Sequence, residues 1–219
     1  MIEIKNITKR YRKGSQVFTA LDEVTFDINK NDFIVVKGPS GAGKSTLLFT
    51  IGGMVHPDSG EILFKGRNIY DLNTMGMNYY KKKYIGFMFQ QFHLMPYLTV
   101  KENVELACYD NSHFTEINYF LQKCSLAEMK NKYPSELSVG EKQRTAFIRA
   151  IISKPDLLLA DEPTGNLDPA NSTVLISLIE DYHKNGGTVL LVSHDPKADE
   201  FASQKITIEK GRIDLPLNP

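Results

Sequence analysis

The chain has 219 residues, 42% hydrophobic and 24% charged, which is the composition of a globular protein and the length of one domain. Its 26 basic and 26 acidic residues balance, and this neutrality argues against a nucleic-acid binder, which normally carries a basic excess. The charged start, MIEIKNITKRYRKG, excludes the apolar core of a signal peptide, and no uncharged run approaches the roughly 20 apolar residues of a membrane-spanning helix.

Strand patterns dominate the first part of the chain. Residues 2–7 and 17–28 alternate between polar and apolar side chains, which predicts half-buried antiparallel strands. The continuous apolar run at 33–37 predicts a strand covered on both faces, and it leads through glycines into a helical pattern at 46–54. Further strand patterns follow at 61–66 and 84–89.

The second part of the chain begins as a helical block and then alternates. The pattern is helical from 99 to 153, after which strand patterns return at 157–160, 188–192 and 205–209, separated by helical stretches at 169–184 and about 196–202. Alternation of strand and helix predicts a mainly parallel α/β core. The helical block, about 91–150, reads as an insertion into that core.

The clearest chemical motif is GPSGAGKST at 38–46, which matches G-x-x-x-x-G-K-[ST] between a predicted strand and a predicted helix. Glycines let backbone N–H groups approach phosphate oxygens, and the helix N-terminus adds partial positive charge. Lys44 would reach the β- and γ-phosphates, and the Ser45 hydroxyl would coordinate Mg²⁺. The alternative is a plain glycine-rich turn, against which motif and context argue together. The expected nucleotide-binding residues are Gly38, Pro39, Ser40, Gly41, Ala42, Gly43, Lys44, Ser45 and Thr46.

A pair of acids follows the predicted strand at 157–160. Asp161 and Glu162 would lie at the carboxyl end of that strand, where open α/β sheets bind their ligands. Asp161 is expected to hold the Mg²⁺ shell, as the second acid of phosphate-loop enzymes does. Glu162 could orient and deprotonate the attacking water. Two solvated acids at a strand end are the alternative, since acids are common there.

Residues 137–144, LSVGEKQR, resemble the LSGGQ-x-QR signature of ABC ATPases. Other elements of this family follow in the family's order and cover essentially the whole chain. Tyr11 resembles the aromatic residue that stacks on adenine, and Gln90 resembles the glutamine of the Q-loop. Asp168, in the string GNLD, resembles the D-loop aspartate, and His194 resembles the switch histidine.

The resemblance implies a fold and a dimeric site. The fold is α/β: a phosphate-loop, RecA-like core with a mainly parallel sheet, an N-terminal antiparallel β-subdomain and an inserted α-helical subdomain. We expect one domain over 1–219, with the nucleotide-binding core and β-subdomain at 1–90 and 151–219 and the helical subdomain, which carries the signature, at 91–150. ATP is expected between two copies, where the signature of one copy meets the γ-phosphate held by the other. The residues implied at that contact are Ser138, Gly140 and Glu141, with Asp168 nearby.

The same resemblance assigns the catalytic and metal-binding roles. Glu162, His194 and Gln90 are the expected catalytic residues, and Ser45, Gln90 and Asp161 are the expected ligands of Mg²⁺. The cofactors implied are therefore ATP and Mg²⁺.

Three strings, at 38–48, 89–106 and 157–169, resemble most closely the lipoprotein-releasing (LolD), macrolide-efflux (MacB) and cell-division (FtsE) group of ABC ATPases. This implies a homodimer that energises export or extraction of a lipoprotein, drug or peptide by a separate transmembrane permease, without nucleic acid. The expected place is the cytoplasm, on the inner face of the membrane through the permease. Two cysteines, too few for a disulfide framework, fit a reducing compartment.

Other functions remain open at this point. An FtsE-like regulatory ATPase would signal through a membrane partner without transport and would share the chemistry of this chain. A soluble ABC ATPase of DNA repair or translation usually carries a long coiled-coil insertion or two cassettes, and neither pattern is present. A nucleotide-binding module without turnover is a further alternative, because position 139 departs from the signature.

That departure is Val139, where the family usually has glycine. A β-branched residue disfavours positive φ and adds bulk near the phosphate. If the glycine serves close approach, Val139 would slow hydrolysis or weaken the dimer. If it only caps a helix, Val139 is harmless, and we expect this second outcome because Gly140 keeps the closest backbone contact.

The stretch 89–100 is rich in large apolar side chains. One interpretation is core packing under a loop, and the other is a groove that receives a cytoplasmic helix of the permease. Both can hold for different members of the set, which are Phe92, Leu94, Met95, Tyr97 and Leu98.

Overall fold

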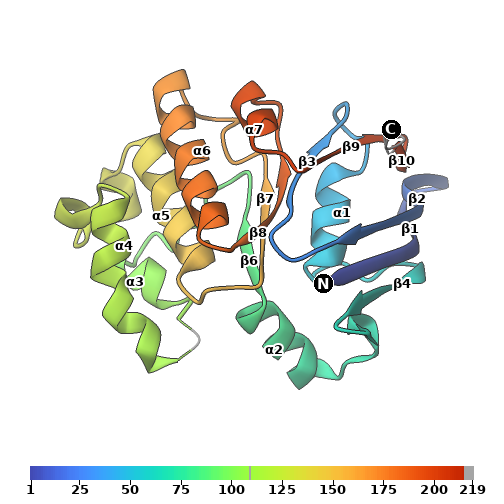
Figure 1. The fold of residues 1–219 in the computed structure, drawn as a ribbon, viewed down its shortest axis with the longest axis horizontal. Helices are drawn as coiled ribbons and strands as arrows, with labels where there is room; N and C mark the ends of the chain where they lie inside the picture. Colours follow the sequence, from blue (N-terminus) through green and yellow to red (C-terminus); the bar gives the residue numbers. More distant parts are fainter. Residues whose placement is uncertain (109, 215–219) are drawn as a thin grey trace.

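Two sheets organise the protein in this computed structural model, which describes residues 1–108 and 110–214. The central sheet has six strands in the order β10-β9-β3-β8-β7-β6, and the second sheet has four strands in the order β2-β1-β4-β5. Figure 1 shows the second sheet and helix α1 on one side of the central strands, and helices α5 and α6 on the other side.

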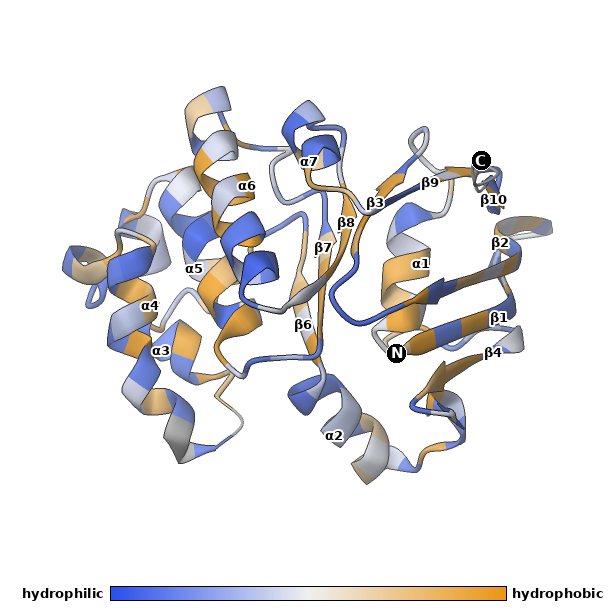
Figure 2. Cartoon of the chain, viewed as in Figure 1, coloured by the Kyte–Doolittle hydropathy of each residue, from blue (hydrophilic) through white to orange (hydrophobic). Residues whose placement is uncertain are grey.

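The central sheet is parallel except at one edge, where β10 pairs antiparallel with β9. All five residues of β7 and all five of β8 are buried, so these strands are covered on both faces, and Figure 2 shows them as hydrophobic. The strands are β3 (Phe33–Lys37), β6 (Ile85–Met88), β7 (Leu157–Asp161), β8 (Thr188–Val192), β9 (Gln204–Glu209) and β10 (Arg212–Asp214).

The antiparallel sheet packs on one face of the central sheet together with α1 (Lys44–Ile51). Ile2 and Ile4 are fully buried, and they share one hydrophobic cluster with Ile34 and Leu159 of the central strands. The strands of this sheet are β1 (Ile2–Lys13), β2 (Gln16–Ile28), β4 (Ser59–Phe64) and β5 (Arg67–Asn68).

The remaining helices cover the opposite face. Val35, Leu158 and Leu191 point to this side, because they belong to the cluster that contains residues of α5 and α6. The helices are α3 (Val100–Glu105), α4 (Ile117–Lys123), α5 (Val139–Ile151), α6 (Pro169–Lys184) and α7 (Pro196–Glu200), with 3-10 turns at Ile69–Asp71, Asn111–Glu116, Ala127–Met129 and Pro134–Glu136. No helix within the described ranges is both long and apolar enough to cross a bilayer.

The predicted fold class is confirmed, with a mainly parallel core, an N-terminal antiparallel sheet and a helical part. The strands predicted at 33–37 and 188–192 and the helix predicted at 169–184 have the observed bounds. Other bounds differ: the first strand continues to Lys13, the helix predicted at 46–54 is observed at Lys44–Ile51, and the strand predicted at 61–66 is observed at Ser59–Phe64. Residues 91–99, at the start of the expected helical subdomain, form a loop before α3.

Helix α2 (Thr74–Lys83) was not predicted from the sequence. Only Tyr80 of its ten residues is buried, so its sequence carries no apolar periodicity. The helix begins where the Asn73 side chain accepts a hydrogen bond from the Gly76 N–H, and it ends on three lysines that suit a helix C-terminus.

Candidate nucleotide site

The phosphate loop lies between β3 and α1 and requires glycine at two close contacts. Gly38 has φ 148°, and a Cβ there would lie 2.1 Å from the Ile208 carbonyl oxygen. Gly43 has φ 109°, and its Cβ would lie 2.0 Å from the Ala20 carbonyl oxygen. No side chain caps the N-terminus of α1, so its first N–H groups have no side-chain acceptor. The loop therefore presents N–H donors to an anion.

Lys44 lies inside this loop and is only 6% exposed. Its Nζ donates to the carbonyl oxygens of Gly38 at 2.7 Å and Pro39 at 3.0 Å, and it lies 3.7 Å from Glu162 Oε1. The carbonyl groups of the phosphate loop thus hold the Lys44 ammonium group beside the backbone N–H groups at the start of α1.

Asp161 ends β7 and is 5% exposed. Burial raises the pKa of its carboxyl group, and the neighbouring Glu162 raises it further, whereas a hydrogen bond from Ser45 opposes this shift. The paired hydroxyl and carboxylate oxygens suit a hard cation such as Mg²⁺. The described residues contain no cluster of three His, Cys, Asp or Glu side chains, so such an ion needs phosphate and water oxygens to complete its shell.

Glu162 combines backbone strain with a lysine and a histidine as close neighbours. Its φ is 44°, an uncommon conformation for a non-glycine residue, and its N–H donates to the Val192 carbonyl at 3.0 Å. The carboxylate Oε1 lies 3.7 Å from Lys44 Nζ and 3.8 Å from His194 Nε2. The side chain is 29% exposed, so water can reach it.

Gln90 lies at the same edge of the sheet. It follows β6, which pairs in parallel with β7 so that Met88 faces Ala160, the residue before Asp161. Gln90 is exposed. The structure thus brings Lys44, Ser45, Asp161, Glu162 and His194 together and places Gln90 at the adjoining strand end.

The signature stretch begins α5 with a reciprocal cap. The Ser138 hydroxyl accepts from the Glu141 N–H at 3.3 Å, while Glu141 Oε2 accepts from the Ser138 N–H at 2.7 Å and from its hydroxyl at 2.8 Å. These bonds lower the pKa of the Glu141 carboxyl group. Val139 is the first residue of α5, has no positive φ and is 45% exposed, so a β-branched residue fits there without backbone strain.

Gly140 and Asp168 meet at Asn171, near the start of α6. A Cβ on Gly140 would lie 2.3 Å from Asn171 Oδ1. The N–H and Nδ2 of Asn171 donate to the two carboxylate oxygens of Asp168 at 2.9 and 2.7 Å, which lowers the pKa of Asp168. Arg144 Nη1 donates to Asn171 Oδ1 at 3.0 Å, so this network joins α5 to α6.

This signature cluster does not meet the phosphate loop within one chain. Figure 1 shows α5 and α1 on opposite sides of strands β6, β7 and β8. Ser138 and Val139 are exposed. The structure therefore contains two separate groups of predicted site residues, one around Lys44 and one at the start of α5.

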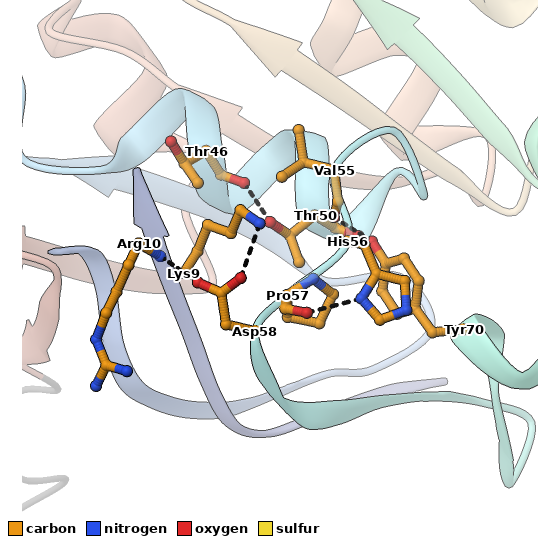
Figure 3. A network of polar contacts seen from close by, with 9 residues as sticks. All are labelled: Lys9, Arg10, Thr46, Thr50, Val55, His56, Pro57, Asp58 and Tyr70. Atoms are coloured by element: carbon orange, nitrogen blue, oxygen red, sulfur yellow. Dashed lines mark hydrogen bonds and ion pairs between the residues drawn. The ribbon is translucent and has the colours of Figure 1, made fainter. Parts of the chain in front are cut away.

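Tyr11 lies on β1 and is 41% exposed. The two residues before it are held by Asp58, which accepts from Lys9 Nζ at 3.1 Å and from the Arg10 N–H at 2.6 Å, as Figure 3 shows. These bonds lower the pKa of Asp58, that from the Arg10 N–H most strongly. The same view shows Tyr70, whose hydroxyl is within 2.6 Å of the carbonyl oxygens of Thr50, in the last turn of α1, and of Val55, in the segment that follows it. The strand that carries Tyr11 is thereby attached to the segment after α1.

Phe18 is a residue of this region that sequence reasoning missed. It pairs directly with Tyr11 across β1 and β2, so both rings lie on the same face, and it is 55% exposed. Two residues further along β2, Ala20 contacts Gly43 of the phosphate loop. The alternation at 17–28 predicted the strand, but only the strand register shows that Phe18 and Tyr11 are neighbours.

Comparison with known proteins gives concordant results. The profile of the ABC transporter family matches residues 21–165. The chain is 38% identical over 218 residues to the lipoprotein-releasing system ATP-binding protein LolD of Buchnera aphidicola, covering 97% of this chain and 96% of that protein. It is 36% identical to the macrolide export ATP-binding/permease protein MacB of Chlorobaculum tepidum, covering 100% of this chain but 35% of that larger protein. A solved dimeric structure, the post-hydrolysis state of the ATP-binding cassette MJ0796 bound to ADP and Pi, superposes with a TM-score of 0.90 at 33% identity, covering 98% of this chain and 97% of that one.

Proposed function

The chain belongs to the ABC transporter family of ATP-hydrolysing cassettes, and from this premise we propose that two copies clamp ATP between them and drive a separate membrane permease. The main support is the separation of the two half-sites in one chain, with the phosphate loop on one side of the central strands and the Ser138 cap on the other. A second copy would bring the missing half to each bound nucleotide, and the similar cassette MJ0796 is a dimer.

Each half-site has residues for one part of the nucleotide. The loop N–H groups and Lys44 would bind the phosphates, and Tyr11 with Phe18 would offer an aromatic face to the adenine. Ser45, Asp161 and Gln90 would hold Mg²⁺, which supplies positive charge beside the phosphates when bound.

Glu162 is positioned for the hydrolytic step. Its carboxylate would accept a proton from water as the water oxygen attacks the γ-phosphorus, and the bond from that phosphorus to the bridging oxygen would break to release ADP. Lys44 and His194 flank the carboxylate at 3.7 and 3.8 Å, so both can hold its orientation. Removing a general base of this kind typically slows the reaction about 10²–10⁴-fold.

The start of α5 would close the site from the other copy. The Ser138 hydroxyl and the Gly140 N–H lie at a helix N-terminus, which favours a phosphate group. Each charge-assisted hydrogen bond contributes about 1.5–3 kcal/mol. Several such bonds at two sites would make dimer affinity depend on ATP, and hydrolysis would release the two copies.

The loop at 91–99 supplies a surface for the permease. Met95 and Tyr97 are 38% and 72% exposed, while Phe92, Leu94 and Leu98 are half-buried. Arg149 of α5 donates to the carbonyls of His93 at 2.6 Å and Phe92 at 2.7 Å, so the loop is attached to the helix that begins with the signature. A permease helix on this loop would therefore be coupled mechanically to Ser138.

Similarity to LolD and MacB favours export or extraction, with a lipoprotein, drug or peptide as the transported class. The permease would hold the chain at the cytoplasmic face of the membrane. Transport with the purified permease tests this part. ATP turnover that depends on the permease but moves no substrate would point instead to a regulatory role.

The clamp is tested with Glu162→Gln, which should bind ATP without turning it over. Sedimentation with ATP should show a dimer for this variant and a monomer without nucleotide, and phosphate release should fall at least 100-fold. Glu200→Gln, an exposed residue of α7 near the same sheet edge, is the matched control and should hydrolyse ATP normally. A Glu162→Gln protein that stays monomeric with saturating ATP contradicts the proposal.

A further inference from the structure

A cavity of about 790 Å³ lies at the edge of the central sheet opposite the nucleotide site. Its walls come from α4, α5, α6 and the residues directly before β7 and β8. Asp161 ends β7 and His194 follows β8 at the other ends of these five-residue strands, so roughly 15 Å separate the two places. The volume falls within the range of small-molecule sites, about 300–1,000 Å³.

The interior of this cavity is apolar and uncharged. Phe147, Ile151 and Leu178 are buried and form part of its wall. Burial raises the pKa of the Cys124 thiol to about 12, so this group is neutral at ordinary pH. The Tyr182 hydroxyl donates to the Pro155 carbonyl at 2.9 Å and needs no other partner. Such a lining suits an apolar ligand body.

The described charged side chains at the cavity leave one unpaired positive charge. The lining includes four lysines and one acidic residue, Asp156. Three of the lysines already pair with acids: Lys65 with Asp156 at 3.0 Å, Lys123 with Asp181 at 3.3 Å and Lys154 with Glu116 at 2.6 Å. The fourth, Lys30, is exposed, and its ammonium group makes no hydrogen bond or ion pair with the residues that the structure describes.

We propose that this cavity binds a small amphiphile with an apolar body and one anionic group, such as a long-chain carboxylate, with the anionic group at Lys30. An anionic group can form an ion pair with Lys30 that a neutral ligand cannot form, and a cation would be repelled by the same ammonium group. Nothing in the phosphate loop or the signature takes part in this binding.

Helix α5 connects the cavity to the nucleotide clamp. Phe147 and Ile151 line the cavity near one end of this 13-residue helix, and Val139 of the signature lies at the other end. Because a packed helix moves as a unit, an occupant that holds the Ile151 end will alter how readily the Ser138 end reaches a second copy. This regulatory step rests on the proposed function, whereas binding does not.

The chain has no tryptophan, so one introduced at the cavity reports binding specifically. Tyr119, on α4, lines the cavity and is 60% exposed, which makes Tyr119→Trp a mild substitution. Titration of this protein with monomeric hexadecanoate, without nucleotide, should give a saturable fluorescence change. Lys30→Glu should raise the Kd about tenfold, as should replacing hexadecanoate with hexadecanol, since one charged hydrogen bond is lost. Lys205→Glu, on an exposed position of β9, is the charge-matched control and should leave the Kd unchanged.

A second variant, Leu178→Phe, fills the apolar part and should weaken binding in a protein whose thermal unfolding is first checked. An absent or non-saturable signal overturns the site, and so does binding that ignores both Lys30→Glu and Leu178→Phe. A response only to vesicles of anionic phospholipid also overturns it, because that result indicates a membrane surface.

Regulation is tested separately in the Glu162→Gln background with ATP. Hexadecanoate, at a concentration near its Kd for the protein with Lys30, should shift the dimer Kd when Lys30 is present, and the shift at that concentration should be much smaller after Lys30→Glu. Saturable binding of hexadecanoate without a shift in the dimer Kd overturns the regulatory step but not the binding site. Failure of the protein to dimerise at all contradicts the proposed function instead.

Discussion

Replacing Glu141 by Gln should tighten the ATP-dependent dimer. Glu141 Oε2 accepts hydrogen bonds from the Ser138 N–H at 2.7 Å and from its hydroxyl at 2.8 Å. The hydroxyl that we expect to donate to the γ-phosphate of the other copy therefore donates to a carboxylate. Glutamine keeps the length and an acceptor oxygen for the cap but removes the negative charge.

The size of the effect follows from this geometry. A phosphate oxygen bound to the Ser138 hydroxyl lies about 2.7 Å from it, which puts two negative groups roughly 5 Å apart. Two unit charges at that distance repel by about 0.8 kcal/mol in the dielectric of water, and more when the interface closes. Two such sites in a dimer amount to about 1.6 kcal/mol, or a dimer Kd about fifteenfold lower. The weaker cap offsets only a few tenths of a kcal/mol in the monomer.

Sedimentation velocity with ATP, in the Glu162→Gln background, measures this Kd directly. The matched control is Glu102→Gln, because Thr99 and Glu102 form the same reciprocal cap at the start of α3, with bonds of 2.8 and 2.7 Å. The gain should shrink as salt rises, since the repulsion is screened. Hydrogen bonds from Ser138 lower the pKa of Glu141, so the carboxylate stays charged and the gain should not vary across the neutral pH range. A dimer Kd that is unchanged or higher in Glu141→Gln, or equally lowered in Glu102→Gln, refutes the reasoning.

Three further substitutions test other parts of the site. Gly140→Ala puts a Cβ 2.3 Å from Asn171 Oδ1 and should lower the free energy of unfolding by about 1–3 kcal/mol in thermal or urea melts. Asp161→Asn should abolish ATP hydrolysis yet stabilise the nucleotide-free protein at neutral pH. Burial raises the pKa of Asp161 in the folded state, so the parent loses stability as pH rises through that pKa, and the variant should lose less in melts across pH 4–7. Phe18→Ala should raise KM for ATP about fivefold with kcat unchanged, as one aromatic contact of about 1 kcal/mol is lost, while Val17→Ala, on the opposite face of β2, should change neither.

Parts of the site whose physical requirements are local could be predicted from the sequence. The phosphate loop needs glycines at positive φ next to a helix start, and its motif encodes these requirements within nine residues, Gly38 to Thr46. The cap at Ser138 is a Ser-x-x-Glu string, which is equally local. The fully buried strands followed from uninterrupted apolar runs for the same reason.

Contacts between distant segments could not be predicted in this way. The position of Phe18 opposite Tyr11 depends on the register of β1 and β2, and the closeness of Gly140 to Asn171 depends on how α5 packs on α6. Helix α2 was not predicted because Tyr80 is its one buried residue, so its sequence has no apolar periodicity. For Phe18 and Gly140 the information lies in pairs of residues that no single sequence window contains.

In the single chain, Lys44 of the phosphate loop and Ser138 of the signature both have hydrogen-bond partners of their own. These internal hydrogen bonds influence how the ATP-bound dimer can separate. Lys44 Nζ donates to two carbonyls of its own loop, and the Ser138 hydroxyl donates to Glu141. ATP binding therefore exchanges these bonds for bonds to phosphate, so each exchange contributes less than the about 1.5–3 kcal/mol of a charge-assisted bond that replaces no internal partner. A dimer held by several such exchanges is stable with the γ-phosphate in place and separates once that group leaves, because each half recovers its internal partners. Internal hydrogen bonds at Lys44 and Ser138 thus favour a dimer that forms and separates with each round of hydrolysis over a dimer that stays closed.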